Sequence, residues 1–196
     1  MSELIYNKIQ ITEKSYLLIT VLPSDMVIDF DSLWKEKPTT KPTLMMYGKE
    51  LETPRYFQSY CVPYYFTGKL NKAEPLPNSF KFLKDFADNS EHGKFDQVLV
   101  NWYDNGLNYI GAHSDDTTQL EKDSPIFSIS LGSTRTFRIR NKIDKKILHD
   151  IPLTDRSIVI MCGKFQTELT HEVVKINGKK GENVGKRINI TFRKYK

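Results

Sequence analysis

The sequence predicts a mainly β (α+β) fold in which a jelly-roll-like barrel or sandwich follows two helices. After residue 97, short segments rich in β-branched residues alternate with turns that contain Gly, Asp, Asn and Lys. Helical spacing of apolar residues occurs only before that point. Successive antiparallel strands with few helices are typical of jelly rolls. The strands expected in this part are residues 98–103, 126–131, 136–140, 157–161, 168–174 and 187–194.

Residues 1–45 are expected to form an N-terminal cap. Residues 16–22 are apolar enough for a strand, and residues 25–36 fit a helix that packs Val27, Phe30 and Leu33. Pro38 and Pro42 then interrupt regular structure.

A second helix is expected to begin with Asn78 or Ser79 as its N-cap. Its apolar residues follow at spacings of three and four, and Gly93 fits its far end. These apolar residues are Phe80, Leu83, Phe86 and Ala87.

The composition indicates a soluble globular protein. A chain of 196 residues can form one domain with a sizeable core, and we expect a monomer. Since no stretch approaches the roughly 18 apolar residues of a membrane span, we expect no membrane partner. Cys61 and Cys162 fit neither a disulfide framework nor a zinc motif, which favours a reducing, intracellular location. We expect that location to be the nucleus in a eukaryote and the cytoplasm otherwise.

The net charge of +5 suits a polyanionic partner. Lysines cluster at residues 142–146 and again at residues 175–186. The same clusters are also compatible with solvated loops that lysine keeps soluble.

His113 and Asp115 are spaced to bind one metal ion together. Residues two apart on a strand point to the same face, and His171 can return on another strand as a third ligand. Two imidazoles and a carboxylate suit Fe(II), Mn or Zn, and they form the facial triad of non-haem iron oxygenases.

The segment from Arg187 to Arg193 predicts a strand with one basic face. Its polar residues alternate with apolar ones, and they are Arg187, Asn189, Thr191 and Arg193. Paired guanidiniums suit a small dicarboxylate, because Arg binds carboxylates bidentately. A 2-oxoacid that chelates iron needs such an anchor at its far end, which favours iron. A salt-bridged edge strand is the alternative interpretation.

From about residue 46 to residue 193 the chain resembles the AlkB family of Fe(II)/2-oxoglutarate dioxygenases, and most of all its duplex-DNA-repair members. The motifs that carry the resemblance keep the family's order and spacing: Asn101-Trp102-Tyr103, His113-Ser114-Asp115-Asp116, Ser124-Pro125-Ile126, residues 128–132 and residues 187–193. The resemblance implies one domain over residues 1–196 with a double-stranded β-helix core over residues 97–196. A finger and a nucleotide-recognition lid would occupy residues 46–70.

The resemblance also implies residue roles. His113, Asp115 and His171 would bind Fe(II) and form the catalytic centre. The 2-oxoglutarate co-substrate would hydrogen-bond Asn101 and Tyr103. In the family, Arg187 and Arg193 bind its carboxylates, and Asn189 and Thr191 line its site.

Substrate contacts are implied upstream of the metal motif and after its last ligand. The aromatic segment that begins at Arg55 contains the lid, residues 64–68, in which the position of Phe66 stacks the base against His113. Residues 47–49 follow the aromatic-Gly-Lys pattern of the family's finger, although Gly48 also fits an ordinary turn. Residues implied to contact nucleic acid are Tyr47, Gly48, Lys49, Arg55, Tyr64, Tyr65, Phe66, Asp116, Lys179 and Lys180.

The implied activity is oxidative demethylation of bases such as 1-methyladenine and 3-methylcytosine in DNA, with double strands preferred and RNA as an alternative. Formaldehyde would be released while 2-oxoglutarate and O₂ become succinate and CO₂. Two alternatives stay open. One is a 2-oxoglutarate oxygenase for RNA or a protein side chain, and the other is a non-catalytic nucleic-acid-binding jelly roll.

Overall fold

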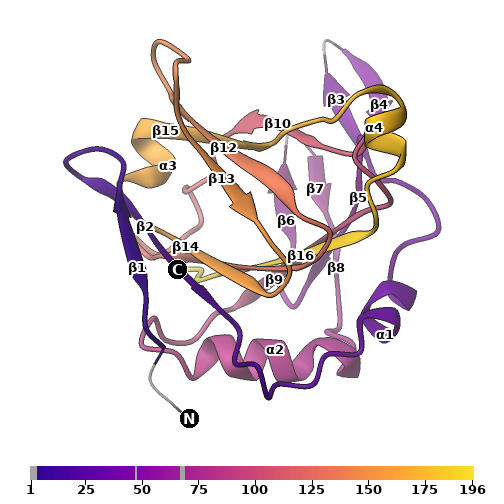
Figure 1. Cartoon of the computed structure of the whole chain (residues 1–196), viewed down its shortest axis with the longest axis horizontal. Coiled ribbons are helices and arrows are strands. Elements are labelled where there is room, and N and C mark those ends of the chain that lie inside the picture. Colours follow the sequence, from indigo (N-terminus) through magenta and orange to yellow (C-terminus); the bar gives the residue numbers. More distant parts are fainter. Residues whose placement is uncertain (1–3, 47, 67–68) are drawn as a thin grey trace.

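Two facing β-sheets form the framework of the protein. The computed structural model describes residues 4–46, 48–66 and 69–196, without the side chains of residues 45, 46, 65, 66 and 69. Figure 1 shows the smaller sheet packed over one face of the larger sheet, with the longest helix on the opposite face. This arrangement is that of a jelly roll, and the predicted mainly β class is confirmed.

The larger sheet has eight strands, and every neighbouring pair is antiparallel except the last. Its strands, in spatial order, are β1 (Asn7–Gln10), β2 (Ser15–Val21), β14 (Ser157–Gly163), β11 (Ile126–Gly132), β16 (Arg187–Arg193), β9 (Gln97–Tyr103), β5 (Tyr56–Tyr60) and β8 (Ala73–Glu74). The segment expected to form a cap thus contributes β1 and β2 to this sheet.

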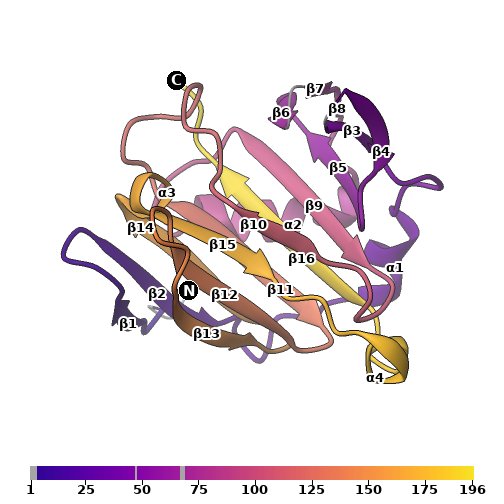
Figure 2. The same ribbon diagram turned by 90° about the horizontal axis from the view of Figure 1, so that it is seen from above.

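The smaller sheet is antiparallel, and two hairpins lie beside the framework. The smaller sheet consists of β10 (Ile110–His113), β15 (Leu169–Val173), β12 (Arg135–Asn141) and β13 (Ile147–Leu153). The hairpins pair β3 (Thr43–Met46) with β4 (Lys49–Glu52), and β6 (Tyr64–Phe66) with β7 (Lys69–Asn71). In Figure 2, β10 lies beside β15.

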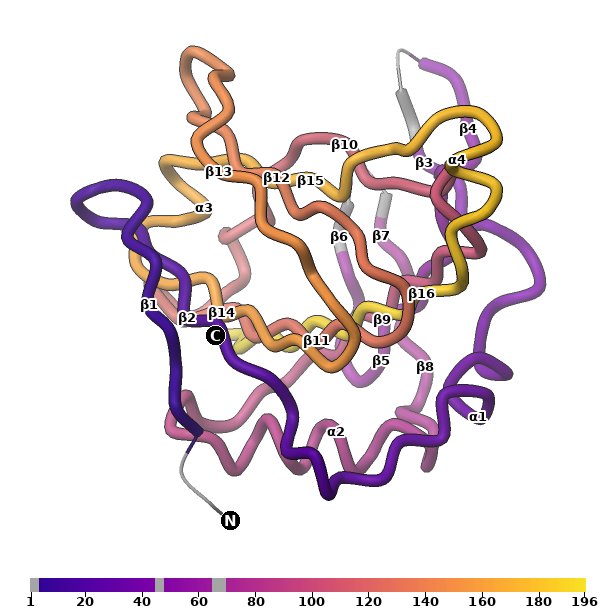
Figure 3. Tube along the Cα trace, viewed as in Figure 1, coloured from indigo at the N-terminus to yellow at the C-terminus, as the bar shows by residue number. Residues whose placement is uncertain are grey.

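Helices occupy the periphery of the sheets. They are α1 (Phe30–Lys35), α2 (Asn78–Asp88), α3 (Phe165–Glu168) and α4 (Gly178–Glu182). The chain between β2 and α1 runs alongside α2 (Figure 3). None of these helices is long and apolar enough to cross a membrane.

Both predicted helices form, with different ends. Asp29 caps α1, where its side chain accepts a hydrogen bond from the Ser32 amide, so the helix starts later than expected and Val27 is 89% exposed. The residue at the N-cap position of α2 is Pro77, which has no side-chain acceptor, so the prediction of a cap at Asn78 or Ser79 is wrong. The C-cap of α2 is Asn89, and Gly93 lies in a later turn with a φ of 75°.

Residue alternation along β9 separates a core face from a pocket face. Val98, Val100 and Trp102 pack with the apolar face of α2 in one hydrophobic cluster. A second cluster, which includes Phe137 and Ile139 of β12, fills the space between the sheets. Because successive side chains of a strand point to opposite faces, the remaining residues of β9 point between the sheets. These residues are Gln97, Leu99, Asn101 and Tyr103.

Candidate metal centre

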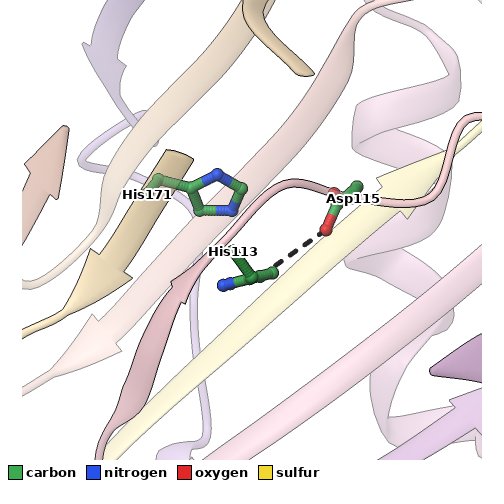
Figure 4. Close-up of side chains that lie close together, drawn as sticks. All are labelled: His113, Asp115 and His171. Carbon is green, nitrogen blue, oxygen red and sulfur yellow. Dashed lines mark ion pairs between the residues drawn. The ribbon is translucent and has the colours of Figure 1, made fainter. Parts of the chain in front are cut away.

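His113, Asp115 and His171 come together between the two sheets. His113 ends β10 and lies directly opposite His171 of β15 in the antiparallel register. Asp115 lies beyond the end of β10, so the prediction that it shares a strand with His113 is wrong. The candidate ligand atoms of the three residues all lie within 4.8 Å of one another, and Asp115 Oδ1 is 3.7 Å from His113 Nε2 (Figure 4).

The three side chains are in the protonation states that bind a cation. Burial lowers the pKa of His113, and burial together with the neighbouring His113 lowers the pKa of His171 to about 3. Burial alone would raise the pKa of Asp115, but Arg193 and the two imidazoles lower it to about 2. Neutral imidazoles and an ionised carboxylate therefore face each other, as metal binding requires.

The ring nitrogens of the two imidazoles differ in their hydrogen bonding. His113 Nδ1 is 2.9 Å from the carbonyl oxygen of Gly111, which fixes the ring and leaves Nε2 towards Asp115. His171 Nδ1 is buried without a hydrogen-bond partner among the described residues. Buried polar atoms are normally paired, so this site fits a metal ion. Two imidazoles and one carboxylate suit Fe(II).

Gln166 and Leu169, which the sequence analysis did not single out, hold the loop that carries Asp115. The Asp115 amide donates to Gln166 Oε1 of α3 at 2.8 Å, and the Ser114 hydroxyl donates to the Leu169 carbonyl at 2.7 Å. Because Leu169 begins β15, the strand of His171, these bonds fix the metal carboxylate relative to the second imidazole. A lone Gln in a short helix gives no sequence signal for this role.

Arg193 is bound to the metal carboxylate in this structure. Its Nε and Nη2 donate to Asp115 Oδ2 at 3.1 and 3.0 Å, and its Nη1 donates to Gln97 Oε1 at 3.0 Å. The side chain is 4% exposed. The sequence analysis expected Arg193 to clamp the co-substrate and did not reveal this contact with Asp115.

Arg187 is a buried cation with spare donors. Its Nη2 donates to Ser130 Oγ at 2.9 Å, while Nε and Nη1 have no partner among the described residues. The residue is 1% exposed, and Tyr103 lies below the guanidinium with its ring centroid 4.9 Å from Cζ. Burial lowers the pKa of Arg187. Since an unpaired buried cation is costly, this position fits an anionic ligand such as a carboxylate.

The other expected co-substrate residues line the same pocket. In the register of β9 and β16, Tyr103 lies opposite Arg187 and Asn101 opposite Asn189. Asn189 Nδ2 donates to Ser128 Oγ at 2.7 Å, and Asn189 Oδ1 accepts from Thr191 at 3.3 Å. All of these residues line the pocket that the metal ligands also line.

The residues expected to contact substrate do not all lie in this pocket. Arg55 is buried, donates to Asn101 Oδ1 at 2.7 Å and lines the pocket, as does Tyr64. Asp116 is exposed, and its Oδ1 accepts from the Thr118 amide at 2.9 Å.

Other predicted contact residues lie in the finger, the lid and α4. Tyr47 lies outside the described residues, and so do the side chains of Tyr65 and Phe66 on β6. Gly48 has a φ of 72° in the turn before Lys49, which begins β4. Lys179 and Lys180 are exposed on α4.

Arg135 is a buried residue that the sequence did not single out. Its guanidinium donates to four carbonyl oxygens, at distances from 2.7 to 3.2 Å. Three of these belong to the loop after β9 and the fourth to the segment after β15: Asn105, Gly106, Asn108 and Val174. Arg135 therefore joins the segment leading to α4 to the framework beside Tyr103.

A jelly roll with two His and one carboxylate between its sheets defines the class of Fe(II)-dependent oxygenases. Residues 29–193 match the family model described as the 2OG-Fe(II) oxygenase superfamily, and the chain belongs to this superfamily. Its cofactor and co-substrate are accordingly Fe(II) and 2-oxoglutarate.

The relatives of the chain are AlkB homologues, which confirms the resemblance to that family. The chain is 27% identical to the human DNA oxidative demethylase ALKBH2 over 77% of its own length and 60% of that protein. Against human alkB homolog 3, an alpha-ketoglutarate-dependent dioxygenase, the identity is 31% over 61% of the chain and 44% of the relative. The chain thus spans 60% or less of either relative.

A solved structure, that of OsALKBH1, shows the same fold. It superimposes with a TM-score of 0.60 at 19% identity, and the match covers 91% of this chain and 97% of that one.

Proposed function

We propose that the protein is an oxidative demethylase of N-alkylated bases in DNA, such as 1-methyladenine and 3-methylcytosine. It would convert 2-oxoglutarate and O₂ to succinate and CO₂ and release the methyl group as formaldehyde. The observation that carries this proposal is a single pocket that holds both a His-Asp-His cluster and two donors of Arg187 that no described residue pairs. The names of the relatives, DNA oxidative demethylases among them, support a base as substrate.

In this proposal His113, Asp115 and His171 hold Fe(II), which with 2-oxoglutarate supplies the oxidation of the N-methyl carbon. Arg193 occupies Oδ2 of Asp115 with two N–H groups, so the carboxylate offers the metal Oδ1. A carboxylate restricted to one oxygen leaves more metal positions open for ligands.

Arg187 would receive the far carboxylate of 2-oxoglutarate through its spare donors Nε and Nη1. Two parallel N–H donors match a carboxylate bidentately, and the buried setting strengthens the contact. Tyr103 and Asn101 lie beside this position on β9 and would hydrogen-bond the co-substrate. The roles of Asn189 and Thr191 are to line the site from β16.

An enzyme that acts on a base inside nucleic acid must hold that base outside the stack. We propose that the lid, which includes Tyr64, Tyr65 and Phe66, and the exposed Asp116 perform this function. Tyr47 would fill the vacated stack as the tip of the β3–β4 finger, with Gly48 and Lys49 beside it. Lys179 and Lys180 would bind phosphates, which gives affinity without sequence readout.

Release of formaldehyde from methylated oligonucleotides tests this proposal. Single- and double-stranded DNA and matched RNA, each with 1-methyladenine or 3-methylcytosine, are incubated with the full chain, Fe(II) and 2-oxoglutarate. We expect formaldehyde and succinate in equal amounts from DNA, and the unmethylated oligonucleotides serve as controls. Succinate without formaldehyde from every oligonucleotide would instead indicate an oxygenase for another substrate, and formaldehyde from RNA alone would reassign the substrate to RNA.

A further inference from the structure

A chain of buried hydrogen bonds connects the metal carboxylate with the turn that precedes the lid. Arg193, bound to Asp115, donates through Nη1 to Gln97 Oε1 at 3.0 Å. Gln97 Nε2 donates to Ser59 Oγ at 3.0 Å, and this hydroxyl donates to the Val62 carbonyl at 2.7 Å. Gln97 and Ser59 are both 0% exposed, so water does not compete for these bonds.

The amide of Gln97 serves both ends of this chain. Gln97 accepts from a guanidinium with its oxygen and donates to a hydroxyl with its nitrogen, whereas a carboxylate or an ammonium would satisfy one end alone. The position is also fixed by the backbone, because Gln97 lies directly opposite Arg193 in the register of β9 and β16. A buried network whose members are all paired holds one arrangement of its side chains.

The far end of the chain lies at the root of the lid. Ser59 is near the end of β5, and the following turn contains Cys61 with a φ of 68°. Val62 then leads to Tyr64, the first residue of the lid, whose ring centroid is 5.1 Å from Arg193 Cζ. The lid is thus connected to Arg193 in two ways, directly through the ring of Tyr64 and indirectly through the hydrogen bonds of Ser59 and Gln97.

We propose that Gln97 is a positioning residue that couples the lid to the metal carboxylate. It holds the Arg193 guanidinium on Oδ2 of Asp115, and through Ser59 it links that arrangement to the turn before the lid. Gln97 is not a catalytic residue, because it acts through Arg193. The inference rests on the proposed function only in taking the His-Asp-His cluster as the metal centre.

Mn(II) binding to the purified full chain, without nucleic acid or 2-oxoglutarate, tests the proposal. We expect Gln97→Met to weaken Mn(II) binding about tenfold, which is the usual loss when an outer partner of a metal ligand is removed. Ser59→Ala should weaken it about threefold, although Ser59 is three hydrogen bonds away from Asp115. The control is Gln58→Met: Gln58 neighbours Ser59 but donates to the backbone carbonyls of Ser59 and Lys72. It should bind Mn(II) as the unmodified chain does.

Coupling is reciprocal, so metal binding must also act on the lid. In the unmodified chain, Mn(II) should slow hydrogen exchange of the amides from Val62 to Phe66. This slowing should be absent in Gln97→Met measured at a Mn(II) concentration that saturates it.

The proposal is overturned if Gln97→Met or Ser59→Ala binds Mn(II) as tightly as the unmodified chain does. It is also overturned if Mn(II) does not change the rate of hydrogen exchange of the lid amides. If Gln97→Met does not fold, Ser59→Ala decides alone, because it removes a single hydroxyl. No nucleic acid is present in these measurements. A failure to demethylate oligonucleotides would therefore leave this result standing, and unchanged affinity would leave the proposed activity standing.

Discussion

Arg193 donates two hydrogen bonds to one oxygen of Asp115, at 3.1 and 3.0 Å, and the other oxygen of that carboxylate faces His113. Each side chain is at most 4% exposed, so the pair is a buried ion pair at the metal centre. Removal of one member of such a pair leaves an uncompensated charge in the interior.

Arg193→Met should therefore destabilise the apoprotein and weaken metal binding. The loss for a broken buried pair is about 3–5 kcal/mol of unfolding free energy. The low pKa of Asp115 gives the sign of the pH dependence: the stabilisation is present above the ordinary pKa of a carboxyl and is lost as the pH falls through about 2. Urea unfolding at pH 7 and Mn(II) titration measure the two effects. Stability equal to that of the unmodified chain would argue against the ion pair.

Arg187→Met should have the opposite effect on stability. Because two donors of Arg187 have no partner among the described residues, an apolar side chain of similar length removes a desolvation cost and should leave the melting temperature equal or higher. The Michaelis constant for 2-oxoglutarate should rise about tenfold or more, since a charge-assisted bidentate contact is worth about 1.5–3 kcal/mol. Mn(II) affinity is the internal control and should not change. Unaltered dependence on 2-oxoglutarate would remove Arg187 from the co-substrate site.

Asp115→Asn should abolish turnover while the fold persists. Asparagine keeps an oxygen that accepts from Arg193 but removes the negative charge that a cation requires. Asp115→Ala is less informative, because it also leaves Arg193 buried without its partner. Formaldehyde release and the melting temperature are measured together. Full activity of the Asn variant would show that the metal is held elsewhere.

Added Mn(II) should raise the melting temperature of the unmodified chain, because a ligand that binds only the folded state stabilises it. At a free concentration 100 times the dissociation constant, the gain is about 2.7 kcal/mol. His171→Ala should abolish this gain, and His149→Ala, which changes an imidazole on β13, should not. An equal gain in both variants would place the metal outside the cluster.

Tyr47→Ala should slow demethylation of double-stranded DNA much more than that of single strands. Stacking on an aromatic side chain is worth about 1–3 kcal/mol per base, and only a duplex has a vacated stack to fill. Neutralising Lys179 and Lys180 should instead weaken duplex binding broadly and reduce its salt dependence. Equal losses on both forms of DNA for Tyr47→Ala would make the finger an ordinary turn.

The sequence by itself determined the fold class and the identity of the chemical groups. Alternation in residues 187–193 predicted β16, and the bounds agree to within a residue because the pattern is local. The His113 and Asp115 pair predicted a shared metal site, and the fold brings His171 to it. The hairpin strand β13 and the short helices α3 and α4 were missed, since a few residues of mixed polarity carry little periodicity.

Only the tertiary structure distinguished the two arginines of β16. In the sequence they occupy equivalent places on one face of a strand, and the same clamp function was expected of both. In the fold, Arg193 lies opposite Gln97 and reaches Asp115. Arg187 lies opposite Tyr103 and keeps two donors without a partner in the part of the chain that the structure describes. The difference depends on residues more than 70 positions away in the chain. A buried charge responds to what surrounds it in space, which the order of residues along one strand does not specify.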